Sequence, residues 1–256
     1  MCELIDSHVH LDDPRFDADR EAVIARARES GVTTQIVPAV AADGWAALRA
    51  LCRAGSGLHA AYGLHPLFLD RHRPQHLDEL RAWLRRERPV AVGECGLDFH
   101  ADGLDRERQR WYFRGQLELA REFGLPVIIH ARQAVEEVIL ALRDIGPLRG
   151  VVHSYGGSEQ QARRLVALGF ALGIGGPVTY ERARRLRRVV AAMPLEALLL
   201  ETDAPDQPCA GHRGERNEPA RLSGILRCVA TLRGESEQMV AAATTRNARR
   251  LFALPA

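Results

Sequence analysis

The sequence predicts an α/β protein whose eight strand-then-helix units close into a (β/α)8 TIM barrel. Short apolar runs recur at regular intervals along the 256 residues. Most of these runs lack the polar alternation of half-exposed strands, and amphipathic segments separate them. A doubly wound parallel sheet is the weaker alternative, and no linker or low-complexity tract divides the chain. We therefore expect a single barrel domain over residues 1–256.

Eight apolar runs are expected to form the parallel strands. Each run is too short to be a helix of the same hydrophobicity, and such runs suit strands that are covered on both faces. In chain order they occupy residues 3–6, 33–40, 58–66, 89–98, 125–132, 150–157, 170–178 and 197–205.

The segments between these runs carry helix boundary signals. Residues 17–31 and 105–124 each end on glycine, which commonly follows the last residue of a helix. Residues 158–169 begin with Ser158, a residue type that caps helix N-termini. These signals predict helices between successive strands, as a barrel requires.

The charged residues exclude several kinds of chemistry. Arginine supplies all 35 basic residues, and 33 acidic residues leave a net charge of +2. Without an overall basic field, an anionic substrate must be bound by local groups. Without lysine, a P-loop, a lysine Schiff base and a carboxylated lysine that bridges two metals are all impossible.

Cysteine usage and hydropathy bear on location. The five cysteines are scattered and form no C-x-x-C pair, which indicates a reducing compartment. No apolar run approaches the roughly 20 residues that span a bilayer. We therefore expect a cytoplasmic protein with no membrane partner. We also expect a monomer.

Imidazoles and carboxylates follow most of the expected strands. Taken singly, each has a plain structural reading, such as a helix cap, a core partner or a turn former. At the carboxyl rim of a barrel, however, so many buried polar groups need a common partner. They are His8, His10, His65, Glu94, His130, His153 and Asp203.

Divalent metal is the partner that fits this set. Imidazole and carboxylate without thiolate suit zinc, manganese, iron or magnesium. Even with His65 left out, six donors exceed what one tetrahedral ion needs, so we expect two ions that share a carboxylate. Glu94 lies in an apolar run and is the expected bridge, whereas the adjacent Cys95 points to the other strand face and should pack in the core.

The whole chain resembles the TatD family of metal-dependent hydrolases, most closely the YjjV-like branch. The matching motifs occur in the family's order: IDSHVHLD, GLHP, VGECGLDF, LPVIIHAR, GVVHSYGG, LLLETDAP and TTRNARRLF. Two departures are Cys95, where an apolar residue is common, and HSYGG in place of the more usual H-x-F-[ST]-G.

The resemblance implies a metal-dependent TIM barrel that hydrolyses phosphodiester bonds in DNA, with 3′ exonuclease behaviour. It also implies two divalent ions, which we expect to be magnesium, manganese or zinc. His8, His10, Glu94 and Asp203 would hold one ion, and Glu94, His130 and His153 would hold the other. Glu94 and Asp203 would be the catalytic carboxylates, with Asp203 both a ligand and the acceptor of the water proton.

Four further residues are expected near the reacting groups. Glu201 precedes Asp203 by two and would either orient a ligand or pair with a buried arginine. His65 would donate to a phosphate oxygen, although capping of its own loop is the alternative. Arg132 shares the inward side of His130 and would grip phosphate. Tyr155 would stack on a base or pack at the rim.

Two arginine-rich segments are expected to have different roles. The loop 209–219 follows the last strand, and its Arg213, Arg216 and Asn217 are expected to contact substrate. Residues 180–190 carry five arginines at helical spacing, which usually marks the solvated face of a helix.

Two other functions remain open at this point. The same metals could hydrolyse another ester or an amide, for example in an aminoacyl-tRNA deacylase. A non-catalytic binding barrel is disfavoured by the complete set of six ligands.

Overall fold

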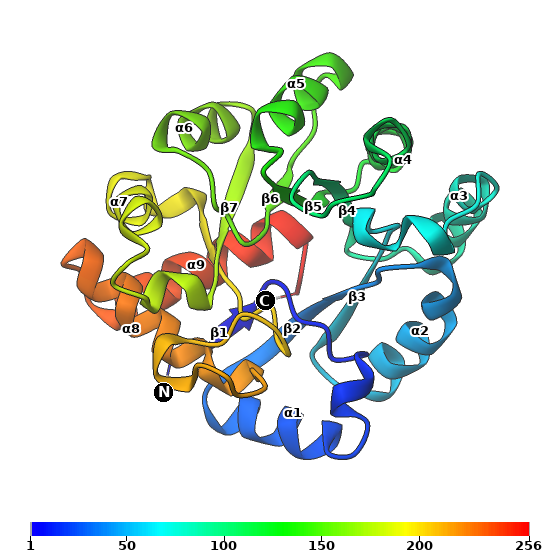
Figure 1. Cartoon of the computed structure of the whole chain (residues 1–256). Coiled ribbons are helices and arrows are strands. Elements are labelled where there is room, and N and C mark those ends of the chain that lie inside the picture. The colour runs from blue at the N-terminus through cyan, green and yellow to red at the C-terminus, as the bar shows by residue number, and fades with distance from the viewer. Residues whose placement is uncertain (1, 256) are drawn as a thin grey trace.

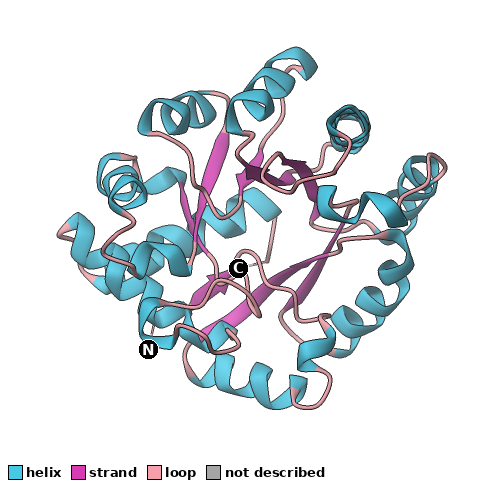
Figure 2. Cartoon of the chain, viewed as in Figure 1, coloured by secondary structure: helices cyan, strands magenta, loops and turns pink. Residues whose placement is uncertain are grey.

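Eight parallel strands form one sheet in the order β1 to β8, and the sheet curls into a barrel (Figures 1 and 2). This arrangement confirms the predicted TIM barrel. The computed structural model describes residues 2–255. The strands are β1 (Leu4–Asp6), β2 (Val32–Pro38), β3 (Leu58–Tyr62), β4 (Ala91–Asp98), β5 (Val127–Arg132), β6 (Gly150–Val152), β7 (Phe170–Ile174) and β8 (Leu198–Leu200).

Helices form the outer ring around this barrel (Figure 1). They are α1 (Arg20–Glu29), α2 (Trp45–Ala54), α3 (His76–Glu87), α4 (Arg106–Phe123), α5 (Val135–Ile145), α6 (Glu159–Ala167), α7 (Arg184–Ala192), α8 (Leu222–Arg233) and α9 (Glu237–Phe252). Short 3-10 turns lie in several loops, among them η3 (Pro66–Arg71) and η6 (Ala210–His212).

The helix ends follow the signals in the sequence. Asp105 caps α4 by accepting from the N–H of Arg108, and Gly124 ends that helix with a φ of 64°. Ser158 and Gln161 form a reciprocal capping box at the start of α6. These side chains satisfy backbone groups that a helix terminus leaves without intrahelical partners.

The barrel interior and α9 form a common apolar layer. Seven strands contribute small or branched side chains to it, and α9 adds Ala248, Leu251 and Phe252. In Figure 1 this last helix (red) lies across the barrel. Because α9 and this layer fill one end of the barrel, polar side chains gather at the other end. The layer includes Ile5, Ile36, Ala61, Ala91, Ile128, Val151 and Leu199.

The barrel is closed between β8 and β1 mainly by hydrogen bonds at the carboxyl ends of the two strands and in the segments that follow them. The N–H of Ser7 donates to the carbonyl of Leu200 at 3.0 Å. The buried carboxylate of Asp6 accepts from the backbone N–H of Thr202 at 3.0 Å and from its hydroxyl. This closure fixes the segments that carry His8 and Asp203. Among residues 2–255, no helix is long and apolar enough to cross a bilayer.

Candidate metal centre

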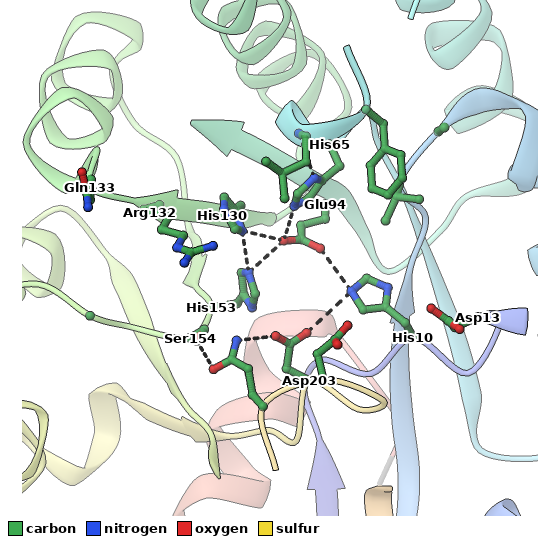
Figure 3. A pocket seen from close by; sticks show the side chains of 18 of the residues that line it. His10, Asp13, His65, Glu94, His130, Arg132, Gln133, His153, Ser154 and Asp203 are labelled. Carbon is green, nitrogen blue, oxygen red and sulfur yellow. Dashed lines mark hydrogen bonds and ion pairs between the residues drawn. The ribbon is translucent and has the colours of Figure 1, made fainter. Parts of the chain in front are cut away.

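The predicted rim residues converge at the carboxyl ends of the strands. Figure 3 shows Glu94 among His10, His65, His130 and His153, with Asp203 facing His10. They line a cavity of about 1220 Å³ that opens at this end of the barrel. The structure therefore brings these predicted side chains together at one cavity.

Glu94 lies at the centre of the rim histidines because β4, which carries it, packs closely against β5. Gly96, two residues later, packs so tightly on β5 that an added Cβ would lie 2.0 Å from the carbonyl oxygen of His130. Glycine at this position therefore lets β4 approach β5 and sets Glu94 beside His130. Cys95 is fully buried, as expected for the opposite strand face.

One oxygen of Glu94 belongs to a first donor group. His8 Nε2 lies 3.2 Å from His10 Nε2, and these nitrogens lie 3.2 and 3.4 Å from Glu94 Oε2. Asp203 Oδ1 lies 3.5 Å from His8 Nε2 and 3.6 Å from His10 Nε2. Four donor atoms thus surround one point.

The other oxygen of Glu94 belongs to a second donor group. Glu94 Oε1 lies 3.2 Å from His130 Nδ1 and 2.8 Å from His153 Nε2. The two imidazole nitrogens are 3.2 Å apart. The two oxygens of one carboxylate therefore face two different sets of histidines.

This spacing fits divalent cations. A tetrahedral ion with bonds of about 2.0–2.1 Å holds its ligands about 3.3–3.4 Å apart. The donor separations in the first group, 3.2 to 3.6 Å, match this edge length. Imidazole and carboxylate donors also have the chemistry that such ions require. The second group has shorter separations of 2.8 to 3.2 Å and one donor fewer, so it could hold a cation that keeps an open position.

Asp98 orients His130 and was not identified from the sequence. His130 Nε2 lies 2.8 Å from Asp98 Oδ2, so its N–H donates to the carboxylate and leaves Nδ1, on the side of Glu94, as the atom that could bind a cation. Burial opposes ionisation of Asp98, but the bonds from His130 and two backbone N–H groups outweigh it and lower the pKa to about 2. Such carboxylate–histidine pairs fix the tautomer of a metal ligand.

Glu201 lies behind His153. This position agrees with the first of its two expected roles, the orientation of a ligand, and not with pairing to an arginine. Its Oε1 accepts from the N–H of Ser154 and lies 3.7 Å from His153 Nδ1. Glu201 is fully buried, and an added Cβ on Gly173 would collide with its carboxylate. Glu201 therefore packs against the histidine and makes no ion pair with arginine among the described residues.

Gln207 connects the ends of β6 and β8 and was also missed. Its amide donates to Asp203 Oδ2, and its carbonyl accepts from the Ser154 hydroxyl at 2.8 Å. Ser154, Asp203 and Gln207 all have positive φ, at 45°, 54° and 49°. Left-handed backbone in such residues is uncommon and often marks a functional site. Burial raises the pKa of Asp203 to about 6.

The tautomer of His65 separates it from the donor groups. Its Nδ1 accepts the backbone N–H of Leu67 at 3.1 Å, so the proton of the neutral ring lies on Nε2. That Nε2 is 3.0 Å from Glu94 Oε1. Burial lowers the pKa of His65 to about 4 and keeps the ring neutral. His65 therefore presents an N–H to the cavity and also caps its loop.

The arginines at the rim differ in their partners. Arg132 is exposed on β5, lines the cavity and lies beside His130 in Figure 3. Arg15 also lines it, but its guanidinium is clamped between Asp13 and Asp206. Arg185 of α7 reaches the cavity and donates to the carbonyl of Gly156 at 2.8 Å. The expectation that residues 180–190 only face solvent was therefore incomplete.

Several predicted substrate contacts lie elsewhere. Tyr155 is only 2% exposed, and its hydroxyl donates to the carbonyl of Ser158 at 2.6 Å, so it packs in the core and cannot stack on a base. Asn217 is fully buried, and its amide donates to the carbonyls of Thr202 and Asp206. Its role is to hold the loop after β8.

The two arginines of that loop do not line the cavity. Arg213 is exposed but is not among the residues that line the cavity. Arg216 forms a two-bond ion pair with Asp19 and covers the ring of Phe16. The predicted substrate contacts from this segment are therefore not supported.

Comparison with known proteins identifies the family. The family described as TatD related DNase matches residues 5–253. The chain is 42% identical to the metal-dependent hydrolase YjjV of Escherichia coli K12, over 100% of both sequences. It is 37% identical to the 3′-5′ ssDNA/RNA exonuclease TatD of Cronobacter sakazakii, over 97% of both.

A solved structure agrees with these sequence matches. The crystal structure of YjjV from Escherichia coli K12 superposes with a TM-score of 0.96, at 42% identity and with 99% of each chain covered. A TatD family hydrolase from Entamoeba histolytica shares the fold at a TM-score of 0.84 and 20% identity, over 98% of each chain. The chain therefore belongs to the TatD family and is a metal-dependent hydrolase.

Proposed function

We propose that this hydrolase holds two divalent ions and cleaves phosphodiester bonds at the 3′ ends of single-stranded DNA. The observation that carries the proposal is the position of Glu94, whose two oxygens face separate donor groups. A carboxylate shared in this way is typical of two-metal phosphodiesterases. The relative from Cronobacter sakazakii, named an exonuclease on single-stranded DNA and RNA, supports the substrate class.

The residues divide the work as follows. Bound divalent ions, magnesium, manganese or zinc, supply an activated water and neutralise phosphate oxygens. Asp203 accepts the proton of the attacking water, because its carboxylate lies within the donor group that would hold one of the ions. His65 donates its Nε2–H to a phosphate oxygen.

The cavity suits a polymer end better than a small molecule. Its volume of about 1220 Å³ exceeds the ~300–1,000 Å³ of most small-molecule pockets. The net charge of only +2 provides little general attraction for nucleic acid. Arg132 supplies a local positive charge beside His130, where its guanidinium can bind a phosphate through two N–H groups.

A panel assay tests this function. Metal-reconstituted protein is incubated with single-stranded DNA, single-stranded RNA, aminoacyl-tRNA and simple carboxylic esters, and products are followed by chromatography. We expect mononucleotides to be released from DNA 3′ ends. If only aminoacyl-tRNA or the esters were cleaved, the phosphodiesterase proposal would be wrong and the deacylase alternative would replace it.

A further inference from the structure

A partly exposed aromatic side chain on one wall of the cavity has no role in the reaction proposed above. Phe68 lies in η3, directly after the segment that carries His65, and is half-buried. It lines the same cavity as the donor groups. Most large aromatic side chains of this chain are buried in the core, so an aromatic ring that borders a polar cavity is unusual here.

Two planar neighbours hold the ring of Phe68. The imidazole of His65 meets it edge-on, with the ring centroids 5.7 Å apart and the planes inclined by 68°. The guanidinium carbon of Arg71 lies 5.3 Å from the Phe68 centroid, within the range of cation–π contacts. Arg71 is itself held by the carboxylate of Asp43. The ring is therefore fixed in place before any ligand binds.

This wall lies beside the reacting centre. His65 Nε2 is 3.0 Å from Glu94 Oε1, and Phe68 packs on the same imidazole ring. A group bonded to a phosphate at the donor centre would therefore reach Phe68 across a single imidazole. Arg132 comes from β5, on another part of the cavity lining, so the phosphate chain and the group on Phe68 have separate contacts.

We propose that Phe68, backed by Arg71, is a shelf on which the terminal nucleobase of a single-stranded nucleic acid stacks. This inference rests on the proposed phosphodiesterase function and specifies how that site selects its substrate. Bases stack on phenylalanine, histidine and arginine planes, and such stacking tolerates every base because each has a π-face. Residues 65–71 place all three kinds of planar group on one wall.

An aliphatic or sugar ligand suits this wall less well. An acyl chain would be bound by branched aliphatic side chains, whereas here the charged guanidinium of Arg71 lies over one face of the Phe68 ring. A base inside a duplex has both faces covered by its neighbours, and a paired base at a duplex end is held in line with the helix by its partner strand. The shelf therefore favours a base at an unpaired end and recognises it without reading its identity.

Two oligonucleotides that differ in one group test the shelf. Both are single-stranded DNA of the same sequence, but one carries an abasic tetrahydrofuran residue at its 3′ terminus. With metal-loaded enzyme, we expect the intact substrate to have a KM about 5- to 150-fold lower, the range expected for one stacked base. Equal KM values for the two substrates would overturn the proposal.

Variants assign the preference to the ring itself. In Phe68→Ala the ratio of the two KM values should fall to about 1, and in Phe68→Trp it should persist. Leu67→Ala removes an exposed apolar side chain beside the shelf but no planar group, so it should keep the ratio. An unchanged ratio in correctly folded Phe68→Ala, checked by circular dichroism, would contradict the assignment.

Binding measurements distinguish a failure of the base-stacking shelf from a failure of the proposed reaction. The dissociation constants of the same two oligonucleotides are measured by fluorescence anisotropy with wild-type protein and Phe68→Ala. Tighter binding of the intact oligonucleotide, lost in Phe68→Ala, would support the shelf even if neither oligonucleotide were hydrolysed, and the failure would then lie with the proposed reaction. Equal binding of both by the wild type would reject the shelf whatever the hydrolysis result.

Discussion

The two donor groups that share Glu94 differ in how complete they are. The first has four donors, with both histidines supplied by the segment after β1 and Asp203 by the segment after β8. The second has three donors, from Glu94, His130 and His153. A tetrahedral cation would be fully ligated in the first group and would keep an open position in the second.

The groups behind the donors differ as well. Gln207 holds Asp203 in the first group through an uncharged amide. In the second group, the carboxylate of Asp98 holds His130, and Glu201 lies behind His153. Extra negative charge behind a three-donor group raises the basicity of its histidines and offsets the missing ligand. If two ions bind as proposed, the first group would fix one of them and the second would present the other to substrate.

Asp203→Asn should have the largest effect, because it removes a charge and a proton acceptor from the first group. The amide keeps an oxygen donor, so we expect metal to remain bound at saturating concentration while turnover falls by about 10²–10⁴-fold. The acidic limb of the pH–rate profile should also flatten, since in the wild type protonation of Asp203 at low pH removes the base. Near-wild-type rates with an unchanged acidic limb would leave Asp203 only a ligand.

His65→Ala and Arg132→Ala should come next, because both residues lie outside the donor groups and are proposed to bind the substrate phosphate. Each should lower turnover by about 10²-fold, the scale of one lost electrostatic contact, with metal content unchanged. Arg213→Ala is the matched control and should be silent, because Arg213 is exposed outside the cavity. Metal loss in either site variant would mean that the residue belongs to a donor group.

Asp98→Asn removes the negative charge of the carboxylate that holds His130, and so it changes only the second donor group. The amide oxygen can still accept from His130, but the negative charge is lost. We expect about 10–100-fold weaker binding of one of the two ions, measured by titration with a competing chelator, and little change for the other. Equal weakening of both ions would show that the two groups are not independent in the way their geometry indicates.

Tyr155→Phe should have the smallest effect, because Tyr155 contributes to the core and not to either group. Loss of the bond to the Ser158 carbonyl should lower the free energy of unfolding by about 0.5–1.5 kcal/mol, measured by urea denaturation. Turnover at saturating substrate should stay within twofold of the wild type. A large loss of activity without a loss of stability would restore a substrate role for Tyr155.

The sequence predicted the donor set because strand ends of a parallel barrel meet at one rim. Strand alternation also placed Arg132 correctly beside His130, since both lie within β5. The same rule failed for Tyr155, because the strand ends at Val152 and Ser154 adopts a φ of 45°, which turns the next side chain into the core.

Residues that act through other side chains were harder to find. Asp98 reaches His130 across neighbouring strands, and Gln207 joins Asp203 to Ser154 across two loops. Spacing along one segment carries no signal for such contacts. The arginines show the same limit, because Arg15 and Arg132 look alike in sequence and only the structure shows that Asp13 and Asp206 neutralise the first.

Metal occupancy of Glu94→Ala tests the shared carboxylate most directly. Wild-type protein and the variant are saturated with manganese or zinc, and the ions are counted by elemental analysis and located by anomalous scattering. We expect two ions per chain in the wild type, and in the variant the loss of at least one, because both donor groups lose an oxygen. Two fully occupied ions in Glu94→Ala would contradict the bridging role.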